Sequence, residues 1–243
     1  MIMFLLKKFL YDFWDNFFFL FILNFGFILL LALGFFLLPV LPAVPVTIFF
    51  FYWFFVYFCT TASVLKEVSD YNRPSPADFF LNIKSALLPA AVFFTIAAFV
   101  FLLIRFTIPI YLQMGTLFGL AAAFFSCWIC LFIIASIQFY PAVYYRLGKR
   151  PLKSIKKCII IFFDNTWFCL FALFLNILMS ILILPFPGFS ILFSDEAVRL
   201  RLLKYDWLET HTRKTNIPWH ELLAEEKETT GSRTLKSFIF PWR

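Results

Sequence analysis

The chain has 243 residues, of which 63% are hydrophobic, 23% aromatic and 14% charged, with a formal net charge of +7 at pH 7. A soluble domain is about half apolar and about a quarter charged, so this composition excludes an ordinary soluble protein. It also excludes a disordered chain, a collagen-like repeat and a disulfide scaffold. We therefore expect an all-α bundle of helices that crosses a membrane several times.

Long stretches without charged residues indicate where the chain crosses the membrane. A helix needs about 20 apolar residues to cross the hydrocarbon layer, and the charge-free stretches have room for five such helices. Proline clusters separate some of them, because proline interrupts a helix, and Arg105 with Pro109 is expected to separate the third from the fourth. The predicted spans are residues 17–38, 44–65, 86–104, 115–140 and 158–184.

The distribution of Lys and Arg predicts the orientation of these spans. With a cytoplasmic N-terminus, the inner segments 1–16, 66–85 and 141–157 carry eleven Lys and Arg residues, and the outer loops 39–43 and 105–114 carry only Arg105. This asymmetry follows the positive-inside rule. We therefore expect a cytoplasmic N-terminus and no nucleic-acid partner, because the net charge is an orientation signal.

Two basic loops end in similar sequences, which suggests a repeat of three helical hairpins. In each predicted hairpin, a segment on the cytoplasmic surface precedes the odd-numbered span; chance similarity is the alternative. The spacing from Asp12 to Asn24 also equals that from Asp164 to Asn176. The repeated features are Tyr71-Asn72-Arg73-Pro74 and Gly148-Lys149-Arg150-Pro151, whose Arg-Pro pairs lie 77 residues apart, and the dipeptides Asp15-Asn16 and Asp164-Asn165.

A third hairpin requires a sixth membrane segment within residues 186–207, with a short helix at 189–205. This segment carries charged residues that cannot face lipid, because each costs about 2.5 to 3.5 kcal/mol at the bilayer centre. Either the bundle shelters the helix, with Asp195 paired to Arg199 at i, i+4, or the helix lies on the outer surface. The first alternative places the C-terminus in the cytoplasm, and we favour it.

The layout resembles that of the YesL-like bacterial membrane proteins over about residues 8–205. The features in common are an aromatic first helix from Phe13-Trp14 to Asn24, the proline-rich turn Leu38-Pro39-Val40-Leu41-Pro42-Ala43, and helix pairs joined by basic loops. The charges from Asp195 to Arg201 depart from the uniformly apolar last helix of that family. The resemblance implies a bacterial inner-membrane protein whose relatives are often encoded near carbohydrate-uptake systems, and it supplies no catalytic residue.

Polar residues within the predicted spans are the first candidates for a functional site, because they are costly to keep in lipid. We expect a polar cavity, although Asp164 would alternatively lie in the solvated interface. In the fourth span Gly115 and Gly119 form a G-x-x-x-G pattern for helix packing, either within the chain or in a homodimer. The residues of the expected cavity are Arg105, Asp164, Asn176, Asp195, Glu196 and Arg199.

These expectations divide the chain into three parts: the membrane bundle at 1–188, a short sixth membrane or interfacial helix at 189–205 and a charged tail at 206–243. The tail is expected to contain a short helix capped by Asn216 and stopped by Gly231. Its basic and aromatic end would bind the membrane surface, its own bundle or a protein partner. The residues expected at a membrane surface or partner are Arg150, Lys153, Lys156, Lys157, Phe238, Phe240 and Trp242.

No motif in the chain predicts an enzyme. The phosphate-binding loop G-x-x-x-x-G-K-[ST] and the nucleophile motif G-x-S-x-G are absent. The two histidines, His211 and His220, lie nine residues apart, and no cysteine is near them in the sequence, whereas a zinc site needs three or four ligands at short range. We therefore expect no cofactor and no metal, and a non-enzymatic accessory or assembly subunit of an envelope or solute-uptake process, with the lipid bilayer and a membrane protein as partners. A small permease is the alternative, and an intramembrane enzyme comes third.

Overall fold

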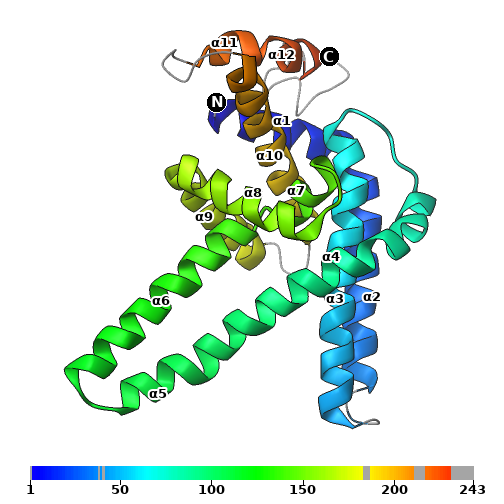
Figure 1. The fold of residues 1–243 in the computed structure, drawn as a ribbon. Coiled ribbons are helices and arrows are strands. Elements are labelled where there is room, and N and C mark those ends of the chain that lie inside the picture. The colour runs from blue at the N-terminus through cyan, green and yellow to red at the C-terminus, as the bar shows by residue number, and fades with distance from the viewer. Residues whose placement is uncertain (1, 38, 40–41, 183–186, 211–216, 231–243) are drawn as a thin grey trace.

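The computed structural model describes residues 2–37, 39, 42–182, 187–210 and 217–230, and within these residues it contains helices and no strand (Figure 1). The all-α fold class is therefore confirmed. The helices are α1 (Ile2–Asp15), α2 (Phe17–Leu37), α3 (Ala43–Ser69), α4 (Pro76–Leu102), the π-helix η1 (Leu103–Thr107), α5 (Ile108–Gln113), α6 (Leu117–Ile137), α7 (Tyr140–Arg146), α8 (Pro151–Asp164), α9 (Thr166–Leu182), α10 (Pro187–Thr210), α11 (Trp219–Leu222) and α12 (Ala224–Thr230).

Four stretches of the described chain are long and apolar enough to cross a membrane, and the bent pair α8 and α9 would count as a fifth. The chain thus has the helices of a multi-pass membrane protein. The first two expected spans, 17–38 and 44–65, match α2 and α3 closely. The four stretches are Phe17–Leu37, Val44–Ser69, Pro76–Gln113 and Leu117–Arg146.

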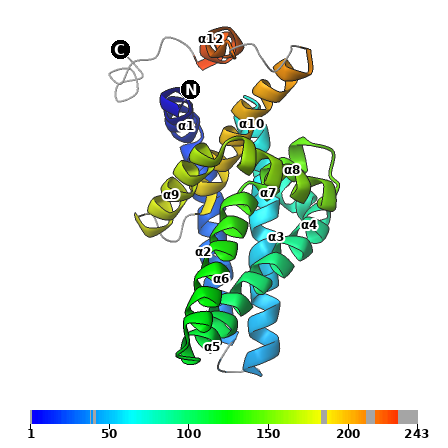
Figure 2. The same cartoon turned by 60° about the vertical axis from the view of Figure 1, so that its left-hand side comes forward.

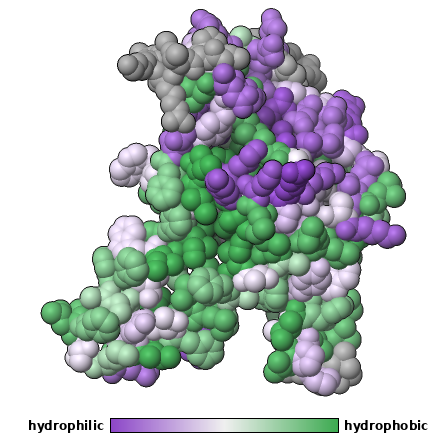
Figure 3. All heavy atoms as spheres, in the orientation of Figure 1, coloured by the Kyte–Doolittle hydropathy of each residue, from purple (hydrophilic) through white to green (hydrophobic). Residues whose placement is uncertain are grey.

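The spanning helices form two legs that diverge from one end of the molecule (Figure 1). In the first leg α2 packs against α3, and in the second leg α5 packs against α6; α4 lies across α3 before it joins the second leg. Helices α1, α10 and α12 lie at the end opposite the tips of the legs in both views (Figures 1 and 2). Apolar side chains cover the legs, and polar side chains gather at the opposite end, called the polar end below (Figure 3).

The third span is longer than expected and does not stop at Arg105. The helix runs from Pro76 to Gln113, passing through η1. Pro109 has no backbone N–H, and its ring would clash with a carbonyl group of the preceding helical turn. The wider π-turn absorbs this conflict: Ile108 donates its N–H to the carbonyl of Leu103, five residues earlier.

The expected fifth span at 158–184 is wrong as a single helix. α8 and α9 meet at Asn165 with a bend of 107°, and residues 183–184 lie outside the described part. The side-chain amide of Asn165 donates to the carbonyl of Ile161. Such a local bond competes with the backbone hydrogen bonds of a continuing helix. The same amide also donates to Tyr205 at 3.1 Å, and Lys204 donates to its oxygen at 3.2 Å. α10 therefore stabilises the bend.

The expected sixth segment is a helix of 24 residues, α10, rather than a short helix at 189–205. It is not among the described helices apolar enough to span a membrane. Its middle is packed among α1, α2, α3, α7 and α9, so the sheltered alternative describes it better than a position on the outer surface. Asn24 on α2 accepts the N–H of Gly188 at 3.0 Å and so satisfies one free donor in the first turn of α10.

The two repeated loops begin with the same type of helix ending. Tyr71 and Gly148, 77 residues apart, both have positive φ, 63° and 96°. The following residues, Asn72 and Lys149, each donate their N–H to a carbonyl five residues earlier, at 2.9 and 3.1 Å. This is the Schellman ending of a helix. The dipeptide Asp15-Asn16 lies at the junction of α1 and α2, and Asp164-Asn165 lies at the junction of α8 and α9. The equal spacing of Asp12–Asn24 and Asp164–Asn176 does not reflect equivalent positions, because Asp12 is buried and Asp164 is exposed.

Candidate functional site: a buried network of charged residues

The charged residues of α10 lie in a well-packed part of the polar end. From Ile191 to Leu200 every side chain of α10 is buried except Arg199, which is partly buried. Asp195 and Glu196 have no exposed surface. A carboxylate that leaves water needs cations and hydrogen-bond donors in its place. The partners of these side chains therefore determine what the site can do.

Asp195 is held by Arg146, the last residue of α7. Nε of Arg146 lies 3.0 Å from Oδ1 of Asp195, and Nη2 lies 2.5 Å from Oδ2, which is the two-point geometry of strong Arg–carboxylate pairs. Ser69, the last residue of α3, donates its hydroxyl group to the same carboxylate. Nη1 of Arg146 also lies 3.0 Å from Oδ1 of Asp70. These contacts join α3, α7 and α10 at one point.

Arg199 connects α10 to two further elements. Its Nη1 lies 2.6 Å from Oδ1 of Asp70 and donates to the carbonyl of Ser69 at the end of α3. Its Nε lies 2.8 Å from Oε1 of Glu226 on α12. A cation at the C-terminus of a helix is favourable, because the free carbonyl groups there carry partial negative charge. Arg199 thus binds both the end of α3 and the tail.

Tyr71 occupies the centre of these contacts in a strained conformation. Its φ of 63° lies in the left-handed region, which costs a non-glycine residue about 1–2 kcal/mol; the equivalent position in the second loop is Gly148. Its ring lies 4.1 Å from Nζ of Lys8 and 5.0 Å from Cζ of Arg199. Its hydroxyl group donates to Oε2 of Glu226 at 2.6 Å. Burial and this bond raise the pKa of Tyr71, so it stays a donor.

α1 brings the third cation. Lys8 is fully buried, forms an ion pair with Asp12 one turn later, and lies 3.3 Å from the carbonyl oxygen of Ser69. Burial lowers the pKa of Lys8, but the carboxylates of Glu196 and Asp12 outweigh burial and raise the pKa above its usual value. Lys8 is therefore charged, and it fastens α1 to the end of α3.

Glu196 differs from its neighbours. Neither of its carboxylate oxygens accepts a hydrogen bond from any part of the chain that the structure describes. Burial raises the pKa of this carboxyl group well above its usual value; Lys8 opposes the effect, while Asp12 and Asp195 add to it.

We name this network the charged hub. It joins α1, α3, α7, α10 and α12, so it ties both ends of the described chain to the middle. No group of His, Cys, Asp and Glu side chains among the described residues has the arrangement of a metal site. Its members are Lys8, Asp12, Ser69, Asp70, Tyr71, Arg146, Asp195, Glu196, Arg199 and Glu226.

Comparison with known proteins adds no family: no family model matches the chain, and no curated protein or solved structure is significantly similar to it. The resemblance to the YesL-like proteins therefore stays a prediction.

The six residues expected around a polar cavity are only partly brought together. Asp195, Glu196 and Arg199 belong to the hub, but the expected pair between Asp195 and Arg199 does not form, because Arg146 and Asp70 take their places. The expected pairing considered only charges on the same helix.

The other three expected residues lie outside the hub. Asn176 on α9 donates to Oε1 of Gln138 at 3.1 Å and to Oγ of Ser194 at 3.2 Å. Asp164 is exposed, and its carboxylate lies 3.9 Å from Nζ of Lys204. Arg105 is exposed in η1 and forms no ion pair within the described residues.

Several hub residues were missed from the sequence. Lys8 and Arg146 were counted only as orientation charges, and Asp70, Tyr71 and Glu226 were not selected as site residues. A signal was available: acids predicted inside a sheltered helix need cations from other segments. The sequence does not say which cations these are, because they lie between 49 and 188 positions away from Asp195 and Glu196.

The two glycines of the fourth span have different roles. Gly115 precedes α6 and is a turn residue with φ of 61°, with no atom within 4 Å of an added Cβ. Gly119 is buried against α5, and an added Cβ would lie 2.5 Å from the carbonyl oxygen of Tyr111. The expected G-x-x-x-G face is therefore not present on one helix, and Gly119 packs within the chain.

The basic residues expected at a membrane surface or partner, Arg150, Lys153, Lys156 and Lys157, are all exposed at the start of α8. Within the tail, the expected helix is two short helices, α11 and α12, and α12 packs on the hub. Asn216, Gly231, Phe238, Phe240 and Trp242 lie outside the described residues.

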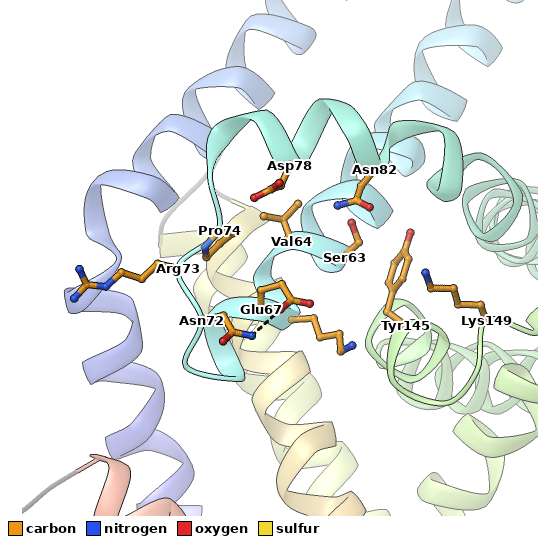
Figure 4. A pocket seen from close by; sticks show the side chains of 11 residues that line it. Ser63, Val64, Glu67, Asn72, Arg73, Pro74, Asp78, Asn82, Tyr145 and Lys149 are labelled. Carbon is orange, nitrogen blue, oxygen red and sulfur yellow. Dashed lines mark hydrogen bonds between the residues drawn. The ribbon is translucent and has the colours of Figure 1, made fainter.

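A polar pocket of about 410 Å³ lies beside the hub, between the end of α3, the start of α4 and the loop after α7 (Figure 4). Its wall contains Lys66 and Lys149, together with two acids that already accept hydrogen bonds. Glu67 accepts a hydrogen bond from Asn72 at 2.8 Å, and Asp78 accepts the N–H of Ser75 at 2.7 Å. The pocket thus combines both signs of charge.

Proposed function

We propose that this protein is a non-enzymatic accessory subunit of a bacterial inner-membrane process, such as envelope assembly or solute uptake, with its polar end and both termini in the cytoplasm. The observation that carries the proposal is the distribution of charge. The buried charged residues of the described chain all lie in the charged hub at one end. A permease would instead need polar groups along a path through its spans.

The legs provide the surface for a membrane-protein partner. In α3, 50% of the most apolar stretch is buried, compared with 17% in the α4–α5 helix and 22% in the helix of α6 and α7. Large side chains such as Phe118 and Phe124 on α6 are 75% and 65% exposed. The fixed hub and the open second leg together favour an anchored protein whose apolar helices contact a partner.

The test is site-specific photo-crosslinking in intact cells. A photoreactive residue at Phe118 or Phe124 is expected to give one defined adduct with another membrane protein, and the same residue at Lys153, on the exposed basic surface of α8, serves as the control. Native Cys127, which is exposed on α6, tests the homodimer: an adduct with a second copy that disappears in Cys127→Ser identifies self-association in place of a different partner.

The alternative function, a small permease, predicts a different result. If the protein purified from mild detergent as a single species without partners, and carried labelled sugar into liposomes, it would be a permease and the accessory role would be wrong. A reporter fused after Arg243 tests the orientation, since the proposal requires a cytoplasmic C-terminus.

A further inference from the structure

Two adjacent acids on α10 have opposite surroundings. Asp195 accepts hydrogen bonds from Nε and Nη2 of Arg146 and from the hydroxyl group of Ser69. Glu196 is equally buried, yet neither of its oxygens accepts a hydrogen bond from the described chain. An unsatisfied buried ionised group costs far more than an exposed one, so a carboxylate in this position requires an explanation.

The cations of the hub are already engaged. Lys8 pairs with Asp12, Arg146 pairs with Asp70 and Asp195, and Arg199 pairs with Asp70 and Glu226. Three cations thus face five carboxylates, counting Glu196. Of the other elements around α10, α2 and α9 contain no charged residue. The last turn of α3 contains Lys66 and Glu67, and the loop after it adds the phenol of Tyr71. Glu196 is the acid without a cation of its own.

We propose that Glu196 is a proton-binding site: its carboxyl group carries a proton at neutral pH and donates it in a hydrogen bond to the carboxylate of Asp12. Asp12 is within hydrogen-bond reach of Glu196 and also pairs with Lys8. The step is simple uptake of one proton from solvent by one carboxylate. The bound proton supplies the missing donor and joins α10 to α1.

The consequence for stability follows from linkage. The pKa of Glu196 is raised in the folded protein above its ordinary value of 4.5, so the folded state binds the proton more tightly than the unfolded chain does. Stability is then greatest below pH 4.5 as far as this group is concerned, and it falls as pH rises toward and through the folded pKa. Loss of the proton leaves two neighbouring carboxylates facing the single charge of Lys8, which weakens the attachment of α1.

Thermal unfolding of the full-length protein in detergent between pH 5 and pH 9 tests this directly. The Tm of the wild type is expected to fall with rising pH by about 3–5 °C for each pKa unit spanned, relative to E196Q, whose side chain is neutral throughout. E226Q is the matched control: Glu226 is buried but fully paired with Arg199 and Tyr71, so this variant should lose stability at neutral pH. If E196Q followed the wild-type pH profile, the proton site would be wrong.

Infrared spectroscopy of the wild type keeps the proposal testable even if E196Q fails to fold. At pH 7 the wild type should show the carbonyl stretch of a protonated carboxylic acid, and E196Q should lack it. A wild-type spectrum without this band contradicts the proposal. So does a recovery of stability at pH 9 on addition of NaCl but not choline chloride, because the site would then hold a sodium ion.

Discussion

The charged hub and the two legs hold their helices together by different forces. In the hub, buried cations contact carboxylates from helices far apart in the chain. The carboxylate of Asp70, for example, forms ion pairs with two arginines, Arg146 and Arg199. In the legs, most contacts are apolar, with isolated polar bonds such as that from Tyr57 to the carbonyl of Leu23. Lipid solvates an apolar side chain as well as another helix does, so apolar burial drives helix association weakly in a membrane. The comparison indicates that the hub determines how the helices are arranged.

Arg146→Ala has the largest expected effect and tests whether the hub organises the fold. This change removes the partner of a fully buried carboxylate and one of the two partners of Asp70, and breaking a buried ion pair costs about 3–5 kcal/mol. We expect a large loss of thermal stability and release of α10 from α3, measured by hydrogen exchange of both helices. Arg105→Ala is the control, since Arg105 is exposed on η1; equal stability of the two variants would show that the hub does not organise the fold.

Gly119→Ala examines the second leg. Its Cβ would meet the carbonyl oxygen of Tyr111 at 2.5 Å and Cβ of Met114 at 2.9 Å, so backbone has to shift, at a cost of about 2 kcal/mol. We expect faster hydrogen exchange in α5 and α6 and no change in the hub. Gly115→Ala is expected to lower the stability by only about 1 kcal/mol, because alanine is unfavourable at this positive φ while an added Cβ meets no other atom. Faster exchange in α10 of Gly119→Ala would mean that the leg and the hub are coupled.

Tyr71→Phe has the smallest expected effect and tests how the tail is held. It removes the hydroxyl bond to the carboxylate of Glu226 while keeping the ring between Lys8 and Arg199, which costs about 1.5 kcal/mol. Hydrogen exchange of α12 should rise, with little change elsewhere. Tyr52→Phe removes a comparable bond to the carbonyl of Leu87 and should leave α12 unaffected; similar exchange of α12 in both variants would argue against a role of Tyr71 in docking the tail.

The helices that the sequence predicts well are those specified by local properties. Residues 17–38 and 44–65 contain no charge, and α2 and α3 form there because an apolar segment of about 20 residues satisfies its own backbone in lipid only as a helix. The loop repeat was also visible, since Arg73-Pro74 and Arg150-Pro151 follow the same helix ending in the structure. Its strained Tyr71 was not, because the reason for a tyrosine there lies in Lys8, Arg199 and Glu226.

The tertiary structure decided the bend at Asn165, the continuation of α4 through η1 and the partners of Asp195 and Arg199. Each depends on groups distant in sequence or on a conflict between neighbouring residues: Tyr205 and Lys204 hold the bend, and the π-turn accommodates Pro109. The sequence by itself determined that this is a multi-span helical membrane protein, because hydropathy and helix length are local. Which buried charge meets which is a property of the folded chain, since an ion pair depends on distance in space, and the unpaired Glu196 is recognised only once all its neighbours are in place.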